Sequence, residues 1–425
     1  MSIGNHIRLS GTAKLFLLFF AVVIISNSLY RHYGRMTAKQ FVIGSDMEGY
    51  YQYLPHLFLK DIEEMRNMRW AKPYGEGRRL SAFTCGVAIM QMPFFLVGHG
   101  VSKFLEMESD GHNPAYFMSV LIAALFYAFI GLYYLYKALK RLFSHRTALI
   151  ISLMAFLATN LYYYTIMSPG MSHVYSFCLV SVFIYFVPGF YANPGFQSSL
   201  KVIFPLALAV LIRPTTIVAG LYLLLYDIRS WKELGKRFYF LAQKWHLLIF
   251  MLIVSLLIFS PQMAYWHYVT GKWFIYSYQD ESFTNALSPK IYTVLFGPRN
   301  GWYIYTPLML VSTLVLFYLV YVRRLSAVAI LTVMVLIIYI NASWWRPTFS
   351  AAAGYRTLVE YIPFMAIPLG FLVENTFGNK TIRWLLMSLF IVFLVYNILF
   401  AFKYSGHIWW NMEWQWSNFL RLVRF

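Results

Sequence analysis

Residues 115–136 read AYFMSVLIAALFYAFIGLYYLY, a run of 22 residues that contains no charged side chain. About 20 apolar residues in a helix, each rising about 1.5 Å, cross the hydrocarbon core of a bilayer. The stretch therefore predicts a transmembrane helix. The same rule predicts ten further spans, at 14–30, 84–104, 147–166, 172–191, 200–226, 246–266, 303–322, 327–343, 357–374 and 382–402.

The composition agrees with a polytopic membrane protein. Of the 425 residues, 60% are hydrophobic and 12% are charged, whereas about 25% are charged in an average soluble domain. We expect an all-α fold, a transmembrane bundle of about eleven spans, with residues 1–425 forming one integral membrane domain. The formal net charge of +19 does not indicate nucleic acid, because the basic residues lie in short segments between apolar runs. Cys85 and Cys178 have no metal-ligand spacing, so no disulfide framework or zinc site is predicted.

Four segments outside the predicted spans are rich in Tyr, Trp and Gly: 31–83, 267–302, 344–356 and the tail 403–425. Aromatic side chains favour the membrane–water interface. We expect interfacial helices in 31–83, the first outer loop, and a second long outer loop at 267–302. The tail is expected outside the membrane or at its interface.

The short connections are the basic ones, which sets the expected orientation. Residues 227–245, the Arg323–Arg324 pair and the segment around Lys380 and Arg383 are predicted to be cytoplasmic. The aromatic segments then face outward together. A simple count of eleven crossings nevertheless puts the basic segment 137–146 on the outer side.

A second topology removes this conflict. It requires that 84–104 enters the membrane without crossing it and that 200–226 breaks into two short segments at Arg213–Pro214. Proline disrupts a helix, and an arginine in mid-membrane is costly unless it faces water or a partner. Both topologies remain open, and we favour the second.

The segment FVIGSDMEGYYQYLPHLFLKD, residues 41–61, places Asp46 and Glu48 among tyrosines just after the first predicted span. Two interpretations of Asp46 are compatible. Ser45 or Asp46 caps an interfacial helix that begins near Met47, and the Asp46 carboxylate accepts a proton from a substrate hydroxyl. A metal site of Asp46 and Glu48 would need an extended segment, because residues i and i+2 diverge on a helix.

Three basic residues stand at or inside apolar segments. Arg213, in LIRPTT, is either a functional residue within a span or an arginine that snorkels to the interface. His173 lies at the boundary of two spans, where a hydrogen-bonded structural role competes with a functional one. Arg299, in FGPRNGWYIYTP, occupies a Gly/Pro-rich turn that suits contact with a phosphate.

Two aromatic segments complete the candidate surface. Residues 261–283 include Tyr278 and an alternating stretch, KWFIYSY, that favours extended structure and either sugar recognition or a plain aromatic belt. Residues 341–363 include Arg356 and Glu360, which are four apart and either pair on one helix face or bind ligand. A carboxylate, several arginines and many aromatic rings on one outer face fit an anionic, lipid-linked substrate.

The order of these motifs resembles the GT-C superfamily of polytopic glycosyltransferases, in the branch of protein O-mannosyltransferases and the lipid A aminoarabinose transferase. The resemblance covers about 14–375 and includes the first-loop aspartate, the basic residue beside Pro, the PQ…W…TGK…YSY loop and the WW…GYR…EYIP segment. It implies transfer of a sugar from a polyprenyl-phosphate carrier to a lipid, glycan or protein acceptor at the non-cytoplasmic face. Asp46 would be the general base, and Arg213 and His173 would lie near the donor.

The sequence departs from this family in two places. Met92-Pro93-Phe94 lacks the lysine of the aminoarabinose-transferase branch, so Arg78, Arg79 or Arg299 would have to bind the donor phosphate. Asp46 and Glu48 are separated by Met47, whereas the mannosyltransferase branch has adjacent acidic residues, which leaves the role of Glu48 open.

We expect no cofactor and no obligatory metal, because a polyprenyl phosphate leaves readily once a base and a cation are in place. Alternative functions are a transporter or flippase of lipid-linked saccharide and an O-antigen polymerase or ligase. The expected location is a bacterial inner membrane, among its lipids, with the site on the outer face.

Overall fold

The computed structural model describes residues 43–44, 46–59, 71–74, 78–278, 281–349, 352–404 and 415–424. The first predicted span, 14–30, lies outside these residues, as does Ser45, one of the two candidate caps. Within the described chain the protein is a polytopic membrane helical protein. Five helical stretches are long and apolar enough to cross a bilayer: Pro114–Lys140, Ser172–Ala192, Trp245–Thr270, Arg356–Thr376 and Lys380–Tyr404.

The count of eleven crossings stays a prediction. Shorter apolar helices account for most of the remaining predicted spans. They are α7 (His145–Leu157), α10 (Phe196–Ile212), α16 (Pro307–Tyr321) and α17 (Ala327–Ser343). Predicted span 84–104 corresponds to α5 (Gly86–Phe104). The remaining short helices outside the first loop are α8 (Leu161–Ile166), α12 (Trp231–Gln243), α14 (Ile291–Phe296), α15 (Trp302–Tyr305) and α20 (Trp416–Val423).

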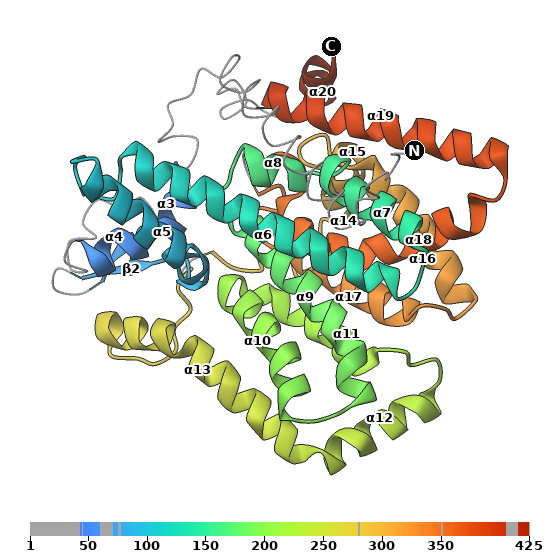
Figure 1. Ribbon diagram of the computed structural model, residues 1–425, viewed down its shortest axis with the longest axis horizontal. Coiled ribbons are helices and arrows are strands. Elements are labelled where there is room, and N and C mark those ends of the chain that lie inside the picture. Colours follow the sequence, from blue (N-terminus) through green and yellow to red (C-terminus); the bar gives the residue numbers. More distant parts are fainter. Residues whose placement is uncertain are drawn as a thin grey trace, which may run out of the picture.

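The centre of the molecule is a group of neighbouring helices in which α6 (Pro114–Lys140) packs on α5 and α9 (Ser172–Ala192), and α9 packs on α10 (Figure 1). Helix α6 starts where Asn113 accepts a hydrogen bond from the Ala115 amide and Pro114 takes the first helical position, both standard N-terminal signals. Helix α13 (Trp245–Thr270) lies on one side of this group and α19 (Lys380–Tyr404) on another. Small residues let α6 and α9 approach closely, as is common in membrane bundles.

The predicted break at Arg213–Pro214 is confirmed. Helix α10 ends at Ile212, and Arg213 is extended, with φ −144° and ψ 108°. Proline then opens a 3₁₀ helix, η2 (Pro214–Gly220), which continues into α11 (Leu221–Leu225). The extended residue before Pro is expected, because the proline ring clashes with a helical predecessor. A second 3₁₀ segment, η3 (Arg356–Tyr361), leads in the same way into α18 (Ile362–Thr376).

The segment predicted to be the first outer loop contains helices, as predicted, and also a hairpin that the all-helical prediction omits. Helix α3 (Asp46–Tyr51) begins at Asp46 and not at Met47, and α4 (Tyr53–Phe58) follows. Strands β1 (Ala71–Tyr74) and β2 (Arg78–Ser81) pair antiparallel, with Ala71 opposite Ser81. The extended character predicted for KWFIYSY does not produce a strand, and 271–278 forms bends and a turn.

The contact between α6 and α9 depends on a glycine. A Cβ atom added at Gly131 would lie 2.7 Å from the Phe177 ring and 2.9 Å from the Cys178 Cα atom, closer than real contacts allow. Gly189, in α9, has nothing within 4 Å of the same hypothetical atom. Alanine at Gly131 is expected to destabilise the protein by about 1–3 kcal/mol through overpacking.

Gly189→Ala is the matched control, since it makes the same chemical change in an exposed helical position where alanine is the better helix former. Thermal unfolding of the detergent-purified proteins should show a lower melting temperature only for Gly131→Ala. Equal melting temperatures for both variants would mean that α6 and α9 are not so closely packed.

Candidate functional site

Five charged or ionisable side chains from separate parts of the sequence meet at one end of the helical bundle, and we call them the charged cluster: Asp46, His173, Arg213, Arg356 and Glu360. The Asp46 Oδ2 atom lies 2.7 Å from Arg356 Nη1. Glu360 Oε1 lies 2.9 Å from Arg213 Nε, and Glu360 Oε2 lies 3.3 Å from His173 Nδ1. The Glu360 side chain is 1% exposed and His173 is fully buried. Buried charges persist only when they are paired, and each arginine here faces a carboxylate.

The pairing differs from the alternative in which Arg356 and Glu360, four residues apart, pair with each other on one helix face. Both residues lie in η3, a 3₁₀ helix with three residues per turn. Residues i and i+3 line up in such a helix, and residue i+4 turns away by about a third of a turn. Arg356 therefore reaches Asp46, and Glu360 reaches Arg213 and His173.

Helix α3 holds Asp46 in place through the tyrosines that follow it. The Tyr51 hydroxyl donates to the Gly111 carbonyl at 2.6 Å, and the Tyr53 hydroxyl donates to the Phe83 carbonyl at 2.7 Å. These bonds join α3 and α4 to the start of α6 and to the segment before α5. The first-loop carboxylate is thus fixed against the bundle even though it lies outside the long helices.

Arg356 enters the cluster from a turn that requires glycine. Gly354 has φ +71°, a left-handed conformation that other residues adopt at a cost. The preceding residue, Ala353, donates its amide hydrogen to the Tyr164 hydroxyl at 3.1 Å and accepts a hydrogen bond from Asn160 Nδ2 at 3.2 Å. The turn is therefore held by the segment around α8, which fixes where η3 begins.

Tyr50 and Tyr278 are among the tyrosines that lie close enough to the cluster for its charges to act on their phenols. Burial raises the pKa of the Tyr50 phenol, while the positive charge of Arg213 partly opposes the rise. Burial likewise raises the pKa of Tyr278, and Tyr50 adds to the rise. Both phenols therefore stay protonated at neutral pH and present O–H donors beside the ion pairs. Phe83 lies between them, with ring centroids 4.5 Å from Tyr50 and 6.2 Å from Tyr278.

Polar atoms of the cluster that are buried and form no hydrogen bond within the described residues include His173 Nε2 and Arg356 Nε. With Nδ1 of His173 donating to Glu360, its Nε2 is an acceptor. A buried polar group without a partner costs about 1–3 kcal/mol, so such groups are suited to binding a polar ligand.

The structure thus brings together Asp46, His173, Arg213 and Arg356 from the sequence-predicted set, with Tyr278 beside them. It adds Tyr50, which the sequence analysis did not propose as a site residue. It also places Glu360 in the cluster, for which the sequence left open a pair with Arg356 or a ligand role. The arginine that Glu360 contacts is Arg213.

The other three predicted residues lie apart from the ion pairs. Arg78, on β2, is exposed, donates to the Tyr268 carbonyl at 2.8 Å and stacks on the Tyr268 ring. Arg299 is half-buried and close enough to Tyr404 for its charge to act on that phenol. Glu48 is half-buried on α3, two residues after Asp46, so the helix directs the two carboxylates to different sides.

Comparison with known proteins was made by sequence and by structure. No family model matches the chain, and no curated protein matches it. Solved structures do match. ArnT from Cupriavidus metallidurans, in the apo state, superposes with a TM-score of 0.52 at 14% identity, over 93% of this chain and 70% of ArnT. ArnT is a GT-C polytopic glycosyltransferase.

The archaeal oligosaccharyltransferase of Archaeoglobus fulgidus, also a GT-C enzyme, matches in two crystal structures. Its complex with Zn and sulfate gives a TM-score of 0.55 at 13% identity, and its apo form gives 0.53 at 12%. The fold of the chain is therefore similar to the folds of these two enzymes. The chain spans just over half of the oligosaccharyltransferase, 53% of its length in one structure and 57% in the other.

The observed pairing can be tested by double-mutant cycles on stability. Removing Asp46 alone or Arg356 alone leaves a buried charge without its partner and should cost about 3–5 kcal/mol. Asp46→Asn combined with Arg356→Gln should cost less than the sum, with a coupling energy of about 1–3 kcal/mol. The same should hold for Arg213→Gln with Glu360→Gln.

The cycle that combines Arg356→Gln with Glu360→Gln is the control, because these residues do not pair in the structure. Its coupling energy should be smaller than that of either observed pair. The assignment of partners is wrong if this third cycle shows the largest coupling.

Proposed function

We propose that this chain transfers a sugar from a polyprenyl-phosphate carrier to an acceptor hydroxyl, with Asp46 as the general base. The observation that carries the proposal is the contact between Asp46 and Arg356 at 2.7 Å, inside a buried cluster that holds a second arginine. A base and two cations in one site are what this displacement requires. The likeness of the fold to two GT-C glycosyltransferases supports the same reaction class.

The reaction that we assign to this site is a single displacement. The acceptor hydroxyl passes its proton to Asp46 while its oxygen attacks the anomeric carbon of the sugar. The bond between that carbon and the carrier phosphate breaks, and its electron pair stays on the phosphate oxygen. Attack and departure on opposite faces invert the anomeric configuration, as in inverting glycosidases.

The arginines have two tasks in this scheme. Arg356 orients the Asp46 carboxylate through Oδ2, and we assign Oδ1 to accept the proton. Arg213, held by Glu360, supplies positive charge for the phosphate oxygen as negative charge develops on it. The low-dielectric surroundings of a buried site strengthen such interactions relative to water.

We propose that the neutral hydroxyl donors and the aromatic rings near the cluster bind the sugar. Tyr50 and Tyr278 present hydroxyls beside the ion pairs, and the Tyr278 ring makes an edge contact with Trp344 at 5.8 Å between centroids. His173 offers its Nε2 acceptor on the side of Glu360. Glu48, Arg78 and Arg299 lie farther out and remain candidates for contact with the outer parts of the substrates.

Asp46→Asn keeps the size and shape of the base and removes its proton affinity, so the transfer rate should fall by about 10²–10⁴-fold. The measurement is mass spectrometry of polyprenyl-phosphate-linked sugars and surface glycans from cells that carry either form. Accumulated donor and one missing glycan residue are expected, and they would also identify the sugar.

Glu106→Gln is the control, because it neutralises an exposed carboxylate in the connection after α5 and should leave the profile unchanged. Both variants must be present in the membrane at wild-type amounts. An unchanged profile for Asp46→Asn would remove the base assignment and favour a carrier or flippase that binds the phosphate without chemistry.

We expect transfer to proceed without an added divalent metal. Asp46 is engaged by Arg356, and α3 directs Glu48 away from it. The described residues contain no group of three or more His, Cys, Asp or Glu side chains placed to hold an ion. Activity of the purified enzyme in the presence of a chelator should equal that without it, and activity lost to chelator and restored by manganese or magnesium would contradict this.

A further inference from the structure

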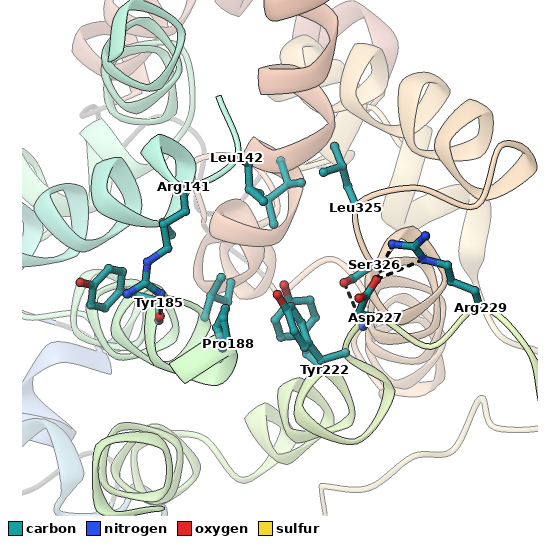
Figure 2. Close-up of a pocket in the computed structure, with 13 residues that line it drawn as sticks. Arg141, Leu142, Tyr185, Pro188, Tyr222, Asp227, Arg229, Leu325 and Ser326 are labelled. Atoms are coloured by element: carbon teal, nitrogen blue, oxygen red, sulfur yellow. Dashed lines mark hydrogen bonds and ion pairs between the residues drawn. The ribbon is translucent and has the colours of Figure 1, made fainter. Parts of the chain in front are cut away.

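A cavity of about 330 Å³ is lined by none of the residues of the charged cluster. Figure 2 shows the residues that line it. It is lined by the end of α6 and the following turn, by α9, by α11 with the loop after it, and by the connection between α16 and α17. The residues that concern its chemistry are Arg141, Tyr185, Tyr222, Tyr226, Asp227 and Arg229. We call it the distal cavity.

Three elements show that the distal cavity and the charged cluster lie at opposite ends of the bundle. Helix α9 carries His173 in its first turn and Pro188, which lines the cavity, 15 residues later. That separation is about 22 Å along a helix. A second segment runs from Arg213 in the cluster, through η2 and α11, to Tyr226 in the cavity lining. A third runs from Glu360 in η3 to Ile367 of α18, which also lines the cavity.

Cationic side chains outnumber anionic ones around this cavity. The Arg141 guanidinium stacks on the Tyr185 ring, 3.9 Å from its centroid, and Lys137 lies 5.3 Å from the same centroid. On the opposite side of the cavity Arg229 pairs with Asp227 at 2.9 Å (Figure 2). The pair is exposed, so it contributes little to stability and can open for another anion. Arg141 has no carboxylate partner among the described residues, so its charge is available to a ligand.

Helix α12 lies next to the cavity and has the features of a helix that rests on a membrane surface. None of its residues is buried, and Trp231 and Tyr239 are 88% and 67% exposed. Lys232 and Lys236 add exposed positive charge. Its Arg237 donates to the Tyr226 carbonyl at 2.8 Å, which ties the helix to the cavity wall. Aromatic and basic residues on one short amphipathic helix favour the headgroup region of anionic lipid.

We propose that the distal cavity binds the phosphate-bearing headgroup of an anionic phospholipid from the surrounding bilayer. Arg141 is the principal contact, with Arg229 and the tyrosine hydroxyls closing around the headgroup. The occupant is a lipid because the cavity lies between the ends of apolar helices and exposed Leu142 is one of its lining residues. In addition, α12 is tied to the cavity wall at Tyr226 and carries the aromatic and basic residues that favour lipid headgroups. The site is separate from the proposed transfer reaction and does not depend on it.

The test is binding of short-chain phosphatidylglycerol to the full-length protein in detergent, read by native mass spectrometry and by the shift in melting temperature. Wild type should bind phosphatidylglycerol and gain melting temperature, whereas phosphatidylcholine of the same chain length should do neither. Arg141→Gln should weaken phosphatidylglycerol binding by about tenfold, which corresponds to one lost charged contact. Arg229→Gln, at an exposed position, should weaken phosphatidylglycerol binding less. It keeps the test valid if Arg141→Gln folds poorly.

Arg146→Gln is the control, because Arg146 is exposed at the start of α7, near the same end of the bundle, and does not line the cavity. It should bind phosphatidylglycerol as wild type does. Equal weakening by Arg146→Gln, or none by either cavity variant, would overturn the proposal. So would saturation by glycerol 3-phosphate at the same concentration, which would show a site for soluble phosphates, or equal binding of phosphatidylcholine.

Discussion

Two largely buried arginines in an apolar bundle impose the strongest physical constraint on this protein. An unpaired guanidinium in such surroundings is costly, and breaking a buried pair is strongly destabilising. The Asp46 carboxylate pairs with Arg356, and the Glu360 carboxylate pairs with Arg213 and also contacts His173. These contacts join the first loop, α9, the break after α10 and η3, so segments far apart in the sequence are fixed relative to one another by charge as well as by packing.

The backbone is interrupted where the arginines enter. A continuous helix satisfies its own backbone groups and directs side chains at fixed intervals, which leaves little freedom to aim a long cationic side chain at a chosen partner. Arg213 precedes Pro214 in an extended conformation, and Arg356 opens a 3₁₀ helix after the left-handed turn at Gly354. Irregular backbone at membrane depth is tolerated where protein buries it, and here it surrounds the candidate site.

Much of the architecture could be predicted from apolar runs and breakers. The long helices, the break at Arg213–Pro214 and the helices of the first loop follow from local patterns that depend on a few neighbouring residues. The partners of the charges could not be predicted in the same way, because they depend on how distant segments pack and on a 3₁₀ geometry that rotates Glu360 away from Arg356. The β1–β2 hairpin was missed because AKPY and RRLS lack the alternation of hydrophobic and polar residues that marks a strand.

The Asp46, Arg213, Arg356 and Glu360 side chains carry two positive and two negative charges in their usual ionised forms, so the cluster is electroneutral before any substrate arrives. The anionic carrier of the proposed reaction would add a negative charge to a place that has no surplus of positive charge. Entry must therefore be linked either to proton uptake or to an exchange in which phosphate takes an arginine from a carboxylate. An exchange at Arg356 would release the Asp46 carboxylate at the moment when the donor binds. The electroneutral arrangement would thus couple binding of the proposed donor to release of the proposed base.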